Sequence, residues 1–152
     1  MLMYRVILKV FVMKHKKFEN LTKYIVWLKN DDIGSWVIDD ENDGTLEHPF
    51  IMPYIKYSKT VGSFIDDVYK FDEENKHFEL VDYRNILERN GIEWGDESMC
   101  NADVSLLDAQ CVLAMIMGVL RAERFNDGVL LSFFKRGVIC RWLKRLEELD
   151  EN

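Results

Sequence analysis

Apolar residues follow one another with little interruption from Leu106 to Leu120. A helix that is apolar on every side is either buried in a protein or placed in a membrane. A helix over these residues is about 22 Å long, shorter than the roughly 30 Å core of a bilayer. Asp108 and Gln110 also interrupt its first turns. We therefore expect residues 106–120 to form the buried central helix of the fold.

Helical periodicity recurs on both sides of this segment. Apolar residues from Leu21 to Leu28 recur at helical spacing after Asn20, a favourable N-cap residue. Gly137 separates two apolar segments near the C-terminus. The pattern predicts helices over residues 21–28, 59–74, 129–136 and 138–150.

Residues 35–57 replace this periodicity with β-branched and aromatic residues on either side of the sequence DDENDG. Such runs around a turn sequence predict a small β-hairpin or a pair of extended arms, with Pro53 at an edge. The predicted fold class is therefore mainly α (α+β). We expect a compact domain of five to six helices around residues 106–120, with the β element at about 35–57.

The chain of 152 residues is long enough for one domain with a single core, so we expect one globular domain over residues 1–152. Its first stretch differs from a signal peptide, because Arg5 and Lys9 interrupt the apolar run and no small-residue cleavage site follows. Residues 1–12 are either a buried strand or short helix of the fold, or a non-essential extension ahead of a second start at Met13.

Charge is unevenly distributed along the chain. Residues 1–30 carry a net charge of +6, residues 31–110 of −14 and residues 111–152 of +1. A net charge of −7 disfavours direct binding to nucleic acid, which requires clustered basic residues. An acidic surface over residues 31–110 could bind a basic partner.

Cysteine and histidine usage favours the cytoplasm and predicts no cofactor. The three cysteines form no CxxC pair and are odd in number, which suits a reducing compartment: Cys100, Cys111 and Cys140. The three histidines are far apart in the sequence and show no metal-ligand spacing: His15, His48 and His77. Acidic neighbours should raise the pKa of Cys100, so we assign no catalytic residue.

Polar residues ahead of the central helix are interpreted as a structural cap. Ser105 and Asp108 match the capping signature S/T-x-x-D/E, and Asp103 lies near the positive end of the helix dipole. Trp94 is more consistent with a hydrophobic plug than with a stacking platform. We keep Trp94 and Glu97 as candidate binding residues.

Arg121 and Arg124 are a second candidate binding site. Their i, i+3 spacing places them on one face at the end of the central helix. They could bind a phosphate or carboxylate together, or they could stabilise the helix end and pair with a neighbouring acid.

Residues 39–50 partly match a calcium-binding loop. Asp39, Glu41 and Asp43 occupy alternate ligand positions, and Gly44 follows at the turn. Phe50 stands where the bidentate glutamate should be. An acidic hairpin turn therefore explains the segment better, and we expect no metal there.

Several short motifs of the chain resemble a family of small uncharacterised bacterial proteins, a domain of unknown function. The resemblance covers roughly residues 20–150, and the motifs are NGIEWG (90–95), ESM (97–99), NADVS (101–105), LDAQ (107–110), RAERF (121–125) and RWLKRL (141–146). It implies a soluble intracellular bacterial protein, and it supplies no activity and no catalytic residues.

Three functional hypotheses follow. We favour a non-catalytic module that binds another macromolecule, most plainly a protein, through the acidic surface of residues 31–110 or an exposed aromatic patch. The first alternative is a small hydrolase acting on a phosphate- or nucleotide-bearing substrate through Arg121 and Arg124. The second is an acidic mimic of nucleic acid, which requires carboxylates spaced regularly along one face.

Overall fold

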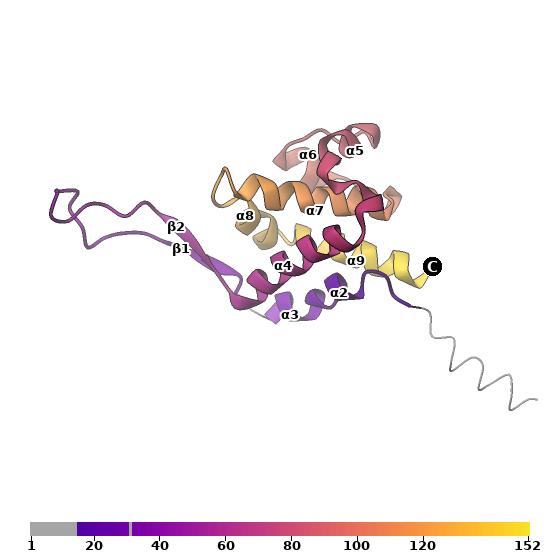
Figure 1. The fold of residues 1–152 in the computed structure, drawn as a ribbon, viewed down its shortest axis with the longest axis horizontal. Helices are drawn as coiled ribbons and strands as arrows, with labels where there is room; N and C mark the ends of the chain where they lie inside the picture. The colour runs from indigo at the N-terminus through magenta and orange to yellow at the C-terminus, as the bar shows by residue number, and fades with distance from the viewer. Residues whose placement is uncertain (1–14, 31) are drawn as a thin grey trace, which may run out of the picture.

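The computed structural model describes residues 15–30 and 32–152, so the interpretations of residues 1–12 lie outside the described residues. A helical body carries a two-stranded arm that projects from one end (Figure 1). The mainly α (α+β) fold is thereby confirmed. The helices are α2 (Glu19–Thr22), α3 (Tyr24–Asn30), α4 (Lys59–Glu74), α5 (Tyr83–Arg89), α6 (Asp96–Asn101), α7 (Ala109–Glu123), α8 (Val129–Lys135) and α9 (Val138–Glu151), with the 3-10 helices η1 (Lys76–Phe78), η2 (Leu80–Asp82) and η3 (Val104–Leu106).

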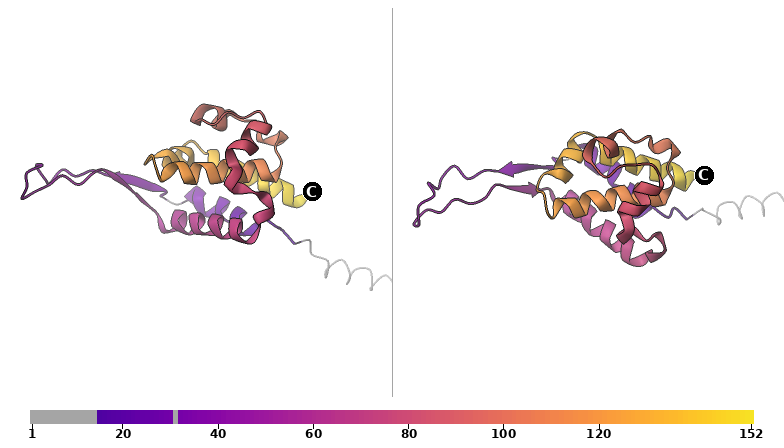
Figure 2. Two further views of the ribbon diagram at one scale, coloured as in Figure 1. Left: turned by 45° about the horizontal axis from the view of Figure 1, so that its top comes forward. Right: turned by 90° about the horizontal axis from the view of Figure 1, so that it is seen from above.

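The central helix α7 is buried as predicted. Every residue from Cys111 to Leu120 is buried. Helices α5, α8 and α9 pack against α7, which lies between α5 and α9 in the body (Figure 2). The uninterrupted apolar sequence of α7 therefore reflects contacts on all of its sides.

The predicted start of this helix at residue 106 is wrong. Leu106 belongs to η3 and is 81% exposed. Asp108 is the N-cap of α7, and its carboxylate accepts a hydrogen bond from the Cys111 N–H at 2.9 Å. Because this cap satisfies an N–H group of the first turn, the helix begins at Ala109.

The predicted capping role of Ser105 is also wrong. Asp103 is the N-cap of η3 and accepts hydrogen bonds from the Ser105 N–H at 3.1 Å and the Ser105 hydroxyl at 2.6 Å. The hydroxyl of Ser105 therefore donates to Asp103 and does not accept from the first turn of α7. Asp103 and Asp108 are both caps, each of a different helix.

Asn20 is not the N-cap of the first described helix. It lies inside α2, whose N-cap position is occupied by Phe18. The N–H of Phe18 donates instead to the buried carboxylate of Asp150 in α9, at 2.9 Å. An acceptor 132 residues away thus ties this helix start to the C-terminal helix.

The arm, defined here as residues 34–57, consists of two short strands and the segment between them. Strands β1 (Gly34–Val37) and β2 (Tyr54–Tyr57) are antiparallel, and Val37 faces Tyr54 where the pairing ends. The predicted hairpin is therefore present, but residues 38–53 continue beyond the paired strands to form the distal part of the arm (Figure 1).

Hydrogen bonds fix the base of the arm to the end of α7 and to the first turn of α8. The Tyr57 hydroxyl donates to Glu123 Oε1 at 2.6 Å and accepts from the Leu131 N–H at 3.1 Å. Burial, together with the Glu123 carboxylate, raises the pKa of Tyr57, so its hydroxyl stays protonated. A Cβ at Gly128, where φ is +104°, would lie 2.8 Å from Trp36 Cζ2. The close approach of Trp36 therefore requires glycine at position 128.

Candidate functional site

The arm concentrates exposed apolar side chains. Of the large hydrophobic residues that are exposed in the described part of the chain, seven of thirteen lie between residues 34 and 57. They are Trp36, Ile38, Leu46, Phe50, Ile51, Met52 and Tyr54. A cluster of apolar side chains on a projecting element is typical of a contact surface for another molecule.

Two aspartates accept hydrogen bonds from the tip of the arm, which is the segment of residues 39–51. Asp39 accepts hydrogen bonds from the N–H groups of Glu41 and Asn42, each at 3.1 Å, and from the Ile51 N–H at 2.8 Å. Asp43 accepts from the Thr45 N–H at 3.0 Å. These bonds give the tip a defined turn structure without help from the helical body.

The calcium-loop candidate has a different role in the structure. The carboxylates of Asp39 and Asp43 accept hydrogen bonds from the tip itself, and the ring of Phe50 lies against Gly44. No group of three acidic, histidine or cysteine side chains able to hold a metal ion occurs among the described residues. The geometry of Asp39, Glu41 and Asp43 is that of an acidic turn.

A hollow of about 320 Å³ lies on the arm, between its strands and its tip. Its lining combines the acidic residues Asp39, Asp40 and Glu41 with the apolar residues Val37, Ile38, Ile51 and Tyr54. Such a lining suits a partner group that is cationic at its end and apolar along its stem, as lysine and arginine side chains are.

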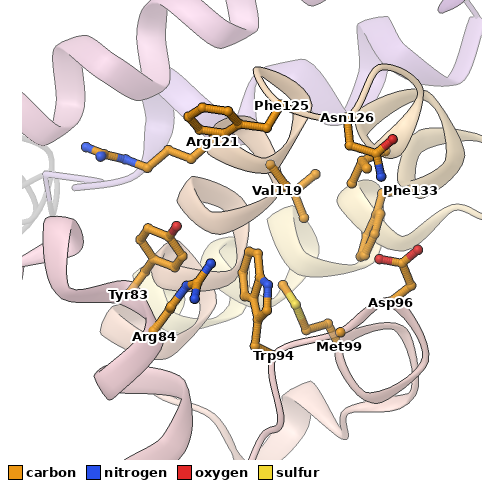
Figure 3. Close-up of a pocket in the computed structure, with 13 residues that line it drawn as sticks. Tyr83, Arg84, Trp94, Asp96, Met99, Val119, Arg121, Phe125, Asn126 and Phe133 are labelled. Atoms are coloured by element: carbon orange, nitrogen blue, oxygen red, sulfur yellow. The ribbon is translucent and has the colours of Figure 1, made fainter.

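A second cavity lies on the helical body beside Trp94 (Figure 3) and has a volume of about 400 Å³. Helices α5, α6, α7 and α8 and the segments that join them supply its walls. Trp94, Met99, Val119 and Phe133 form apolar parts of the lining. Polar groups line it as well, so this cavity offers both shape and charge to a ligand.

Trp94 packs closely enough against α7 to exclude a side chain at Gly118. A Cβ at Gly118 would lie 2.5 Å from Trp94 Cζ3. The indole remains 39% exposed, and the guanidinium of Arg84 lies over it at 5.2 Å from the ring centroid. Trp94 is therefore more than the plug that the sequence suggested, because its ring also forms a cavity wall and stacks with a cation.

Arg121 and Arg124 do not converge on one site. Arg121 lines the cavity and its guanidinium lies 6.0 Å from the Tyr83 ring centroid, whereas Arg124 lies over Tyr69 of α4 at 5.1 Å. The arginine that accompanies Arg121 at the cavity is Arg84, on a different helix. A predicted anion site made by Arg121 and Arg124 together is thus not supported by the geometry.

The comparison with family models gave a match over residues 13–152, to a family described as a family of unknown function, DUF6508. The chain belongs to the DUF6508 family. This confirms that the chain is a member of a family of unknown function, as its motifs indicated. The comparison with curated proteins gave no significant match, and neither did the comparison with solved structures.

The other residues that the sequence singled out in this DUF6508 protein, Glu97 and the cysteines Cys100 and Cys111, do not line the cavity. Glu97 is exposed on α6 and forms a surface ion pair with Arg136 at 3.3 Å. Cys100 and Cys111 are buried, and burial raises the pKa of both thiols, that of Cys111 to about 11. Neither thiol is thereby activated as a nucleophile.

None of the described helices of this DUF6508 protein combines the length with the apolar character that a membrane-crossing segment needs.

Proposed function

We propose that this DUF6508 protein is a non-catalytic binding module of the cytoplasm, and that its arm binds a basic, partly apolar segment of another protein. The observation that carries this proposal is the exposure of seven large apolar side chains on one projecting element. Exposed apolar clusters of this kind mark interaction sites, because water contact makes them costly unless a partner covers them.

The charge of the arm supports a basic partner. Residues 34–57 contain five carboxylates and a single lysine, Lys56. The hollow lined by Asp39, Asp40 and Glu41 places three of these carboxylates beside apolar walls. Complementary charge speeds encounter with a partner and rejects acidic competitors.

The same geometry favours a protein partner over mimicry of nucleic acid. A mimic requires a regular row of free carboxylates, whereas Asp39 and Asp43 are engaged by N–H groups of the tip. Exposed apolar residues such as Phe50 and Met52 lie on the same arm as the acidic residues. This mixture of apolar and acidic groups resembles the core and rim of protein interfaces.

Site-specific photo-cross-linking in the host tests this proposal. A photoreactive phenylalanine analogue is placed at Met52 on the arm or, as the matched control, at Val81 on the body; these side chains are 80% and 70% exposed. We expect an adduct with one protein from position 52 only, in a partner segment rich in lysine or arginine. High salt should reduce its yield, because exposed charges are then screened.

Three outcomes would contradict the proposal. Equal adduct formation from positions 52 and 81 would show that the arm is not selective. Adducts between two copies of this chain would show that the arm mediates self-association and does not bind a different protein. Cross-linking to an acidic segment would contradict the proposal that the partner segment is basic.

A further inference from the structure

We propose that the cavity beside Trp94 is a binding site for a small aromatic carboxylate that carries a hydrogen-bond donor at the opposite end of its ring. This site is on the helical body and is independent of the function proposed for the arm. Three parts of its lining, described in turn, select the three parts of this ligand: a cationic end, apolar walls and an acceptor end.

The cationic end is the guanidinium of Arg84 beside Trp94, whereas the guanidinium of Arg121 extends past Tyr83 on the side away from Trp94 (Figure 3). Each guanidinium lies near an aromatic ring, Arg84 at Trp94 and Arg121 at Tyr83. Within residues 15–30 and 32–152, neither arginine forms an ion pair with a carboxylate. Arg121 Nε is buried and has no hydrogen-bond partner among the described residues. The unneutralised guanidinium of Arg84 at the cavity favours an anion, and a carboxylate matches its planar donor geometry.

The apolar walls favour a flat ring attached to that anion. The indole of Trp94 faces the cavity beside Val119 and Met99, and Phe133 lies on the far side (Figure 3). An aromatic ring would displace water from these walls, whereas a small hydrated anion such as phosphate would leave them wet. The cavity volume of about 400 Å³ suits a ligand of this size.

The acceptor end consists of Asp96 and Asn126. Figure 3 shows both on the opposite side of Trp94 from Tyr83 and Arg84. Among the described residues, no side-chain hydrogen bond or ion pair engages either group. The carboxylate of Asp96 would repel the anionic end of the ligand and accept a hydrogen bond from a hydroxyl at the other end. This separation of charge sets the direction in which the ligand lies.

Titration of the full chain with three matched probes tests the proposal. The probes are 4-hydroxyphenylacetate, its carboxamide and phenylacetate, with inorganic phosphate as a fourth. Binding is followed by calorimetry and by the indole N–H resonance of Trp94, which Trp94→Phe identifies. We expect 4-hydroxyphenylacetate to bind and to shift that resonance, and the carboxamide and phenylacetate each to bind at least about tenfold more weakly.

Substitutions then locate the site. Arg84→Gln should raise the Kd of 4-hydroxyphenylacetate at least about tenfold. Arg89→Gln is the matched control, because Arg89 lies on the same helix as Arg84 and does not line the cavity. It should leave the Kd unchanged. Because Arg84 is exposed, Arg84→Gln should leave the fold intact.

The proposal is overturned if 4-hydroxyphenylacetate at millimolar concentration gives neither heat nor a shift of the Trp94 resonance. It is equally overturned if the carboxamide binds as well as the acid, if phosphate binds more tightly than the aromatic acid, or if Arg89→Gln weakens binding as much as Arg84→Gln.

Discussion

Gly118 lies in the middle of the buried helix α7, where a glycine costs about 0.5–1 kcal/mol relative to alanine. The structure gives the reason for it, because the Trp94 ring occupies the space that a side chain would need. A residue that weakens the helix by itself thus allows a contact between α7 and the segment before α6. The same contact forms one wall of the cavity.

Gly118→Ala tests this close contact. The added Cβ would lie 2.5 Å from Trp94 Cζ3, so we expect the free energy of unfolding to fall by about 1–3 kcal/mol, despite the better helix propensity of alanine. Denaturant titration measures the change. In a Trp94→Ala background, where Tyr83 Cδ2 at 3.2 Å is the remaining close neighbour, the same substitution should cost clearly less. Equal effects in both backgrounds would show that the indole does not restrict position 118.

At the level of single residues, the sequence identified some members of the cavity and missed others. Arg121 and Trp94 were found because each belongs to a distinctive local motif. Arg84 was missed because its place depends on how α5 packs against α7, which no local pattern contains. Arg124 was wrongly grouped with Arg121. The i, i+3 spacing could not show that the guanidinium of Arg124 packs over Tyr69 of α4, away from the cavity.

At the level of elements, the segment between the two strands of the arm has an internal structure that depends on Asp39. The N–H of Ile51, the side chain of Asn42 and the N–H groups near it donate to this carboxylate and lower its pKa to about 2. Folding therefore favours the ionised form of Asp39. The order of the tip should be complete above the ordinary pKa near 3.8 and should be lost as pH falls toward about 2.

An NMR titration checks this pH dependence. The amide resonance of Ile51 should move with a midpoint near the lowered pKa of Asp39, about 2. Asp39→Asn should move the same resonance at neutral pH, whereas Asp40→Asn, the neighbouring control, should not. An unchanged Ile51 resonance in Asp39→Asn would contradict the role assigned to this carboxylate.

Element types were predictable here, and element boundaries were less so. The periodicity of α4, α8 and α9 and the apolar run of α7 gave these helices closely, because each pattern reflects burial directly. The start of α7 was misplaced because two successive sequences, one at Ser105 and one at Asp108, can each cap a helix. The acceptor for the Phe18 N–H could not be predicted from the local sequence, because Asp150 is far away in the chain.

At the level of the whole molecule, the buried helix α7 makes the helical body a scaffold, and the base of the arm is fixed to it through Tyr57 and Glu123. The sequence predicted a mainly helical fold with a hairpin. It did not show that the hairpin projects, since exposure of its apolar residues depends on where the rest of the chain packs. The stability of the helical body should therefore not depend on the distal part of the arm.

A protein with a shortened arm tests whether the helical body is stable, and whether it binds, without the distal part of the arm. Residues 38–53 are replaced by Asn-Gly, which closes a two-residue turn between Val37 and Tyr54, the facing pair at the end of the strands. Both strands and the Tyr57 anchor remain. The measurement is the affinity of this variant for the partner segment found by cross-linking, with its melting temperature as the control for folding.

We predict that the shortened protein melts within about 4 °C of the full-length protein and no longer binds the partner segment. Binding with unchanged affinity by a folded, shortened protein would contradict the account.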